Sequence, residues 1–123
     1  MLFLLVSCAV SEEESLAGQI ESTIDELNEL TAQIDEALIK DNIGDARELV
    51  PQYAAKAKEY EALADQYVEI SKSSKDPVVK AELDMIKQNR ITIRENVEEW
   101  VNTLQAYDDL VTVLNAILIL TED

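Results

Sequence analysis

Carboxylates are the only chemically reactive side chains that this chain carries in large number. Its 123 residues include 26 Asp and Glu, one Cys and no His. The absence of His removes the commonest general base and the usual haem ligand, and it excludes most zinc sites. Di-metal carboxylate bundles also require Glu-x-x-His, so they are excluded as well. The spacing of a calcium loop is absent, and two isolated glycines cannot form a phosphate-binding loop. The sequence therefore predicts no enzyme, no metal site and no cofactor.

The charge of the chain is strongly negative and unevenly distributed. The formal net charge is −16, which repels phosphate backbones and argues against nucleic-acid binding. Residues 11–41 contain ten acids and one base, whereas residues 45–75 contain six acids and five bases. One interpretation is that the first segment is oriented within the fold by the basic residues Lys56, Lys58, Arg90 and Arg94. The other is that it presents a negative stripe to a basic partner.

The elements that must position these side chains are long helices. Only two Gly and two Pro occur, and apolar residues recur at alternating steps of three and four. This pattern predicts helices at about 12–41, 46–74 and 77–122, the last of which could be broken near residue 108. We expect an all-α, antiparallel three-helix bundle with coiled-coil-like seams, or a four-helix bundle if that break occurs, forming one domain over residues 11–123.

The two reversals between these helices are indicated by helix-capping residues. Asp45 and Glu48 can form a capping box at the first reversal. Pro51 lies six residues beyond Asp45, so the second helix is expected either to kink there or to begin at Val50-Pro51. Asp76 followed by Pro77 is typical of an N-cap and a first helical residue.

Several polar and aromatic residues fall on the predicted seams. Arg90 takes a seam position where Leu or Val is usual, and we interpret it as a register-setting residue that pairs with a Glu of the first helix or reaches solvent at the rim. The aromatic residues recur at helical spacing, which predicts core positions, with a ligand groove as the alternative. They are Tyr53, Tyr60, Tyr67, Trp100 and Tyr107.

The C-terminal part of the long third helix would extend beyond its neighbours. Residues 77–122 would span about 69 Å, against about 45 Å for each earlier helix, and the extra segment from Asp108 is apolar on nearly every side. Either it folds back at Asp108 or it pairs with another chain, and we favour self-association. The predicted oligomer contacts are Leu110, Val113, Leu114, Ile117 and Leu118.

The N-terminus begins with a short apolar run that ends at the single cysteine. Met1 to Cys8 is hydrophobic, and the sequence becomes acidic from Ser11, as at the end of an export signal. Leu5-Val6-Ser7-Cys8 resembles the lipobox of prokaryotic lipoproteins, although no Lys or Arg precedes the run. The resemblance covers these four residues and their apolar lead-in, and it implies cleavage before Cys8 and lipidation of its thiol. Residues 1–10 are thus predicted to be a lipoprotein signal and anchor segment.

Three functions are compatible with this sequence. The first is a lipoprotein that is anchored to the membrane of the cell envelope through Cys8, faces away from the cytoplasm and acts as a helical spacer or interaction module. Its partner would be a second copy or another envelope protein. The second is a cytoplasmic acidic coiled-coil adaptor or chaperone-like protein in which Cys8 is simply buried. The third is a bundle that senses a ligand or a cation between its helices.

Overall fold

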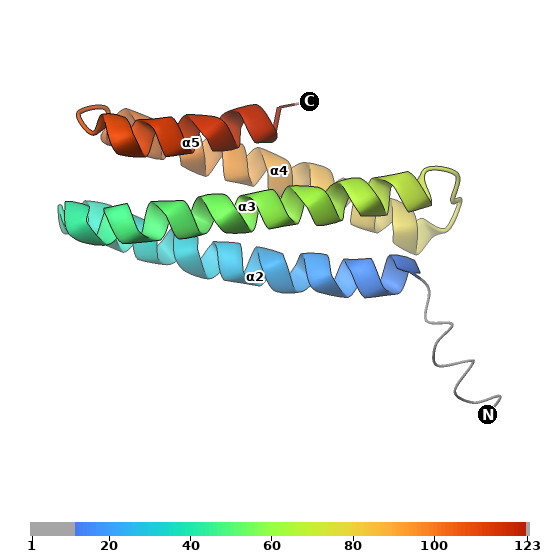
Figure 1. Ribbon diagram of the computed structural model, residues 1–123. Coiled ribbons are helices and arrows are strands. Elements are labelled where there is room, and N and C mark those ends of the chain that lie inside the picture. Colours follow the sequence, from blue (N-terminus) through green and yellow to red (C-terminus); the bar gives the residue numbers. More distant parts are fainter. Residues whose placement is uncertain (1–11, 123) are drawn as a thin grey trace.

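The protein is a bundle of antiparallel helices (Figure 1). The computed structural model describes residues 12–122, and within them the regular structure consists of four helices. These are α2 (Glu12–Ile39), α3 (Ile43–Ser71), α4 (Pro77–Thr103) and α5 (Asp108–Leu120). The all-α fold class is confirmed, and the bundle is of the four-helix kind because the predicted helix over 77–122 is divided in two.

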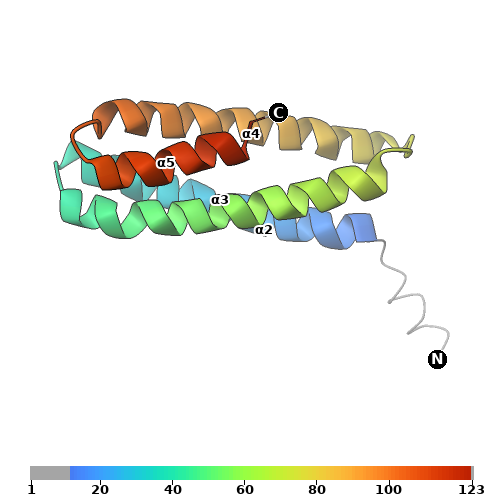
Figure 2. The ribbon, with the colours of Figure 1, turned by 45° about the horizontal axis from the view of Figure 1, so that its top comes forward.

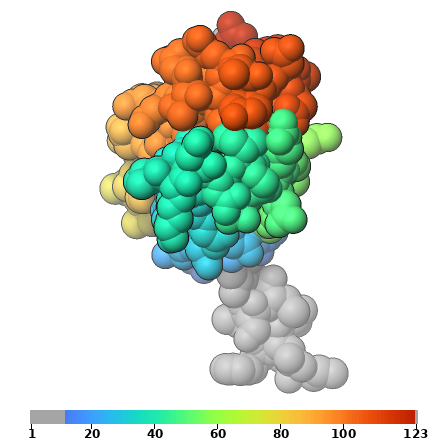
Figure 3. Space-filling view, turned by 90° about the vertical axis from the view of Figure 1, so that its left-hand side faces the viewer, coloured from blue at the N-terminus to red at the C-terminus, as the bar shows by residue number. Residues whose placement is uncertain are grey.

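Three of the helices have matching lengths and the fourth is half as long. α2, α3 and α4 contain 28, 29 and 27 residues, whereas α5 contains 13. At 1.5 Å per residue, α5 covers about 20 Å of a bundle about 42 Å long. It packs against α3 and α4 and not against α2, and it ends near the middle of the bundle (Figure 2). The α2–α3 turn and the α4–α5 connection lie at the same end (Figure 3).

The first reversal is closed by Asp41 and Asn42, a few residues before the predicted cap. Asp41 adopts the left-handed conformation with φ 56°, and the Asn42 amide donates to the carbonyl of Ala37 at 2.8 Å, which ends α2 as left-handed residues commonly do. The Asn42 side chain then accepts from the Asp45 amide at 3.1 Å. The prediction that Asp45 is the N-cap was therefore wrong, because Asn42 is the N-cap and its side-chain oxygen accepts from the free N–H group of Asp45, the third residue of α3.

The two prolines take different positions in their helices. Pro77 is the first residue of α4, and the Asp76 side chain caps that helix by accepting from the Val78 amide at 2.9 Å, as predicted. Pro51 lies inside α3, which begins at Ile43 and not at Val50. A proline in a helix interior removes one N–H donor, so helix-favouring residues and burial on both sides must maintain α3 through this position.

The break between α4 and α5 occurs without glycine or proline. The Leu104 amide donates to the Trp100 carbonyl at 2.8 Å, and the Tyr107 amide donates to the Leu104 carbonyl at 2.9 Å. These turns reverse the chain while Leu104 stays 1% exposed. The apolar heptad pattern continues through the reversal because its residues remain in the core, so periodicity alone could not reveal the break.

The core is built from the predicted seams. Alanines alternate with large side chains along α3, with Ala57 and Ala64 fully buried between the tyrosines. This alternation allows facing helices to interdigitate. Among the described residues, no helix has the length and apolar character that crossing a bilayer requires.

Candidate functional site

The predicted lipidation site lies outside the part of the chain that the structure describes. Cys8 and the rest of Leu5–Cys8 precede Glu12, the first residue of α2. The N-terminal anchor therefore remains a prediction from the sequence.

The C-terminal apolar segment is covered by its own chain. Leu110, Leu114 and Ile117 are 2%, 0% and 2% exposed and belong to the core, while Val113 and Leu118 are half-buried against it. The fold-back alternative is therefore the correct one. The argument for oligomer contacts through these five residues loses its premise, because α3 and α4 already bury the apolar face that was expected to need a second chain, and self-association itself stays a prediction.

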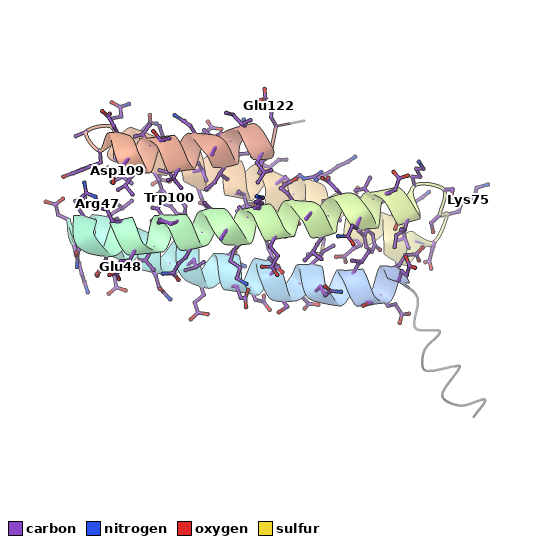
Figure 4. The ribbon with its side chains drawn as sticks, in the orientation of Figure 1. Arg47, Glu48, Lys75, Trp100, Asp109 and Glu122 are labelled. Carbon is purple, nitrogen blue, oxygen red and sulfur yellow. The ribbon has the colours of Figure 1, made fainter. Side chains whose placement is uncertain are left out.

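Polar contacts hold α5 in place at both of its ends. At its start, Arg47 Nε of α3 donates to Asp109 Oδ2 at 3.0 Å (Figure 4). The Arg47 guanidinium also lies 5.4 Å from the centroid of the Tyr107 ring. At its end, Arg94 Nη1 of α4 donates to the Leu118 carbonyl at 2.7 Å and to Thr121 Oγ1 at 3.2 Å. A cation there is favourable because it meets a carbonyl of the last helical turn, at the negative end of the helix.

Arg90 lies just beyond the end of α5 and forms the most buried ion pair among residues 12–122. Its Nε and Nη2 donate to both carboxylate oxygens of Glu61 at 2.9–3.1 Å, and Nη2 also donates to Asp65 Oδ1 at 2.9 Å. The side chains of Arg90 and Glu61 are 20% and 7% exposed. The acids come from α3, so the alternative that paired Arg90 with a Glu of the first helix was wrong, whereas its partial exposure agrees with a place at the rim.

The basic residues do not gather around the acidic first helix. Of Lys56, Lys58, Arg90 and Arg94, Lys56 is the one with an ion pair to α2, through Glu26 at 2.6 Å, and it also contacts Glu59 of its own helix. Lys87, Arg90 and Arg94 instead surround a cavity of about 260 Å³ at the end of α5. Of the two interpretations of the acidic segment, orientation within the fold is therefore supported by one cross-helix ion pair in the described residues.

The aromatic residues mostly serve the core, as predicted. Tyr53, Tyr60 and Trp100 are 0–1% exposed, and the rings of Tyr53 and Trp100 meet edge to face at 4.9 Å. Trp100 Nε1 donates to Asp35 Oδ1 at 2.8 Å, so this acid of α2 satisfies a buried indole. Burial raises the pKa of Tyr53 to about 12, although hydrogen bonds with the side chains of Thr31 and Asn96 oppose that rise.

The most distinctive surface feature is an acidic groove between α2 and α4. It has a volume of about 290 Å³ and is lined by Ile20, Glu21, Ile24, Asp25, Glu82, Met85 and Asn89. Burial raises the pKa of Glu82, and the nearby Glu21 raises it further. No metal-holding group of three His, Cys, Asp or Glu side chains occurs in residues 12–122. The groove thus combines apolar surface with carboxylates that lack a neutralising cation.

The α4 side of this groove was missed by sequence reasoning. Glu82 and Met85 directly precede Leu83 and Ile86, which lie on the predicted seam, and positions beside a seam form the rim of a bundle. Their placement opposite Glu21 depends on how α2 and α4 are aligned. That alignment is set by packing, and a single sequence carries no direct signal of it.

A second groove, between α3 and α5, is more apolar. It has a volume of about 360 Å³ and is lined by Ala54, Ala55, Lys58, Ala116, Ile117 and Leu120. The small alanine side chains leave room above the helix–helix contact, and Lys58 forms no ion pair in the described part of the chain. Apart from Lys58, the groove offers no polar group that would select a ligand.

Comparison with known proteins identifies no relative. No family model, curated protein or solved structure matches this chain.

Proposed function

We propose that this chain is a lipoprotein of the cell envelope that binds another protein through its acidic helical bundle and has no catalytic activity. The observation that carries this proposal is the spacing between the lipobox-like Leu5–Cys8 and Glu12, the first residue of α2. Four residue steps reach at most about 14 Å. A lipid on Cys8 would therefore hold the N-terminal end of α2 close to the membrane, with the bundle facing away from the cytoplasm.

The proportions of the bundle support a role in reaching a partner. Its long helices extend about 42 Å, so the α2–α3 turn and the α4–α5 connection could stand well clear of an anchored N-terminal end. The net charge of −16 disfavours contact with anionic head groups and favours a basic partner. Two acyl chains would supply the membrane affinity, since each buried CH₂ contributes about 0.8 kcal/mol.

Metabolic labelling of producing cells with an alkyne fatty acid tests the anchor. We expect the full-length chain to incorporate the label and to fractionate with membranes, and we expect Cys8→Ala to abolish both. Ser7→Ala keeps a small residue before Cys8 and serves as the matched control that should retain both properties. The anchor proposal is wrong if Cys8→Ala leaves labelling and fractionation unchanged.

The cytoplasmic adaptor is the second candidate, and the acidic groove is the observation that favours it. A groove between α2 and α4 could shield a basic client whether or not Cys8 is lipidated. The same labelling experiment separates the two candidates, because the adaptor predicts an unlabelled chain that still binds basic clients.

A further inference from the structure

The α2–α4 groove has an apolar floor that is open to solvent. Met85 of α4 is 57% exposed, and Ile24 of α2 is half-buried beside it. Exposed Met is well suited to binding surfaces because its unbranched side chain adapts to different partners. Residues 82–89 of α4 border the groove over about 10 Å, which is room for one or two apolar side chains of a partner.

The rim of the groove is negative, and nothing in the described chain neutralises it. Glu21 and Asp25 of α2 and Glu82 of α4 form no ion pair within residues 12–122. No basic residue lines the groove, and Lys56 and Arg90 pair with other acids, namely Glu26 and Glu61. A positive charge brought by a partner would relieve the repulsion between Glu21 and Glu82 across the groove.

We propose that the α2–α4 groove binds a basic amphipathic helix of a partner protein, whose apolar side chains contact Ile24 and Met85 while its Lys or Arg residues pair with Glu21 and Glu82. An amphipathic helix is the occupant that fits, because the groove lies between two long helices and joins an apolar floor to a charged rim. The inference rests on the proposed function as an interaction module, and it does not depend on the lipid anchor.

Binding of a labelled peptide to the full-length Cys8→Ala chain tests the inference without the anchor. The probe is a fluorescent amphipathic helix of Leu and Lys, compared with a peptide of the same composition whose order removes the apolar face. At low salt, we expect the amphipathic peptide to bind more tightly than the control peptide. The double variant Glu21→Gln/Glu82→Gln should weaken its binding about tenfold, a change worth about 1.4 kcal/mol.

The matched control is Glu95→Gln/Glu98→Gln, which removes the same two charges at exposed positions of α4 outside the groove. We expect it to change affinity less than about twofold, because charge far from the contact is screened. Met85→Ser should weaken the binding of the amphipathic peptide and leave the binding of the scrambled peptide unchanged. The inference would be overturned if the two double Glu→Gln variants lost equal affinity, or if the unmodified groove bound both peptides equally. Either result would mean that net charge alone attracts the probe.

The stability of the Glu21→Gln/Glu82→Gln variant separates a binding role from a structural one. Burial and like charge disfavour ionised Glu82, so removing both charges should leave the urea midpoint unchanged or higher while peptide binding weakens. A lower midpoint would show that these acids hold α2 and α4 together, and it would contradict the proposal. Labelling of Cys8 is unaffected by either result.

Discussion

Arg90 occupies a position on the α4 seam where an aliphatic residue is usual, and its neighbours explain why a charge is tolerated there. α5 ends at Leu120, so the α3–α4 face beyond it has no covering helix among the described residues. The seam position is therefore partly open to solvent. The stem of Arg90 still covers the core, while its guanidinium satisfies buried Glu61 and exposed Asp65.

Arg90→Met should destabilise the fold by about 2–3 kcal/mol, because it leaves the Glu61 carboxylate buried and unpaired. Urea unfolding followed by circular dichroism measures the change. The control is Arg47→Met, since the Arg47–Asp109 pair is 50% and 58% exposed and its loss should cost much less than that of the Arg90 pair. Glu61→Leu/Arg90→Met should recover most of the loss. Equal costs for the two single Arg variants would contradict this account.

Tyr53 makes the fold sensitive to alkaline pH. Its pKa is raised by burial from an ordinary value near 10 to about 12. Because the folded-state value is the higher one, this contribution to stability is complete below pH 10 and is lost as the pH rises from about 10 to 12. We expect the unfolding free energy to decrease by about 2–3 kcal/mol over that window on account of Tyr53.

Urea titrations at a series of pH values, with tyrosinate absorbance recorded in parallel, measure this effect. Tyr53→Phe should make the pH dependence shallower over the same window, although Tyr60 and Tyr67, whose pKa values burial also raises, keep part of it. An unchanged slope in Tyr53→Phe would assign the alkaline loss to other groups.

At the scale of elements, α5 completes the bundle over half its length, and two isoleucines on it provide a matched comparison. Ile117 is 2% exposed and Ile119 is 72% exposed. Ile117→Ala should cost about 2–5 kcal/mol because it opens a cavity, whereas Ile119→Ala should change stability by less than about 0.5 kcal/mol. Chemical denaturation measures both. Comparable costs would mean that the outer face of α5 is also covered, for example by a second copy of the chain.

The Asp76-Pro77 boundary and the core tyrosines could be predicted from the sequence because each depends on local chemistry or helical period. The break at residues 104–107 was foreseen only as an alternative. Leu104 and Tyr107 keep the heptad spacing through the turn, and matching the length of α4 to its neighbours is a property of the whole bundle. The partners of Arg90 and the groove opposite Glu21 were missed for the same reason, since each depends on which helices lie side by side.

At the scale of the whole molecule, the charge distribution divides the bundle into an acidic side and a mixed one. α2 contains nine acidic residues and no basic one, and three cross-helix contacts use them, namely Glu26 with Lys56, Asp35 with Trp100 and Glu21 near Glu82. The positive side chains at the end of α5 instead satisfy α3 acids and helix carbonyls. Most of the negative charge on α2 therefore faces solvent, where it repels itself and attracts cations.

Self-repulsion of this kind predicts that salt stabilises the protein. The Debye length falls from about 30 Å at 0.01 M to about 8 Å at 0.15 M ionic strength, so charges along a bundle about 42 Å long interact widely at the lower concentration and only locally at the higher one. Salt also weakens the ion pairs, but those at Lys40, Arg47 and Lys72 are at least half exposed and contribute little. We therefore expect the urea midpoint to rise with added NaCl at neutral pH.

Asp25→Asn/Glu29→Gln, which removes two charges from α2, should raise the low-salt midpoint and reduce the response to salt. A midpoint that falls with salt in the unmodified protein would instead show that attraction between paired charges outweighs the repulsion among the α2 acids.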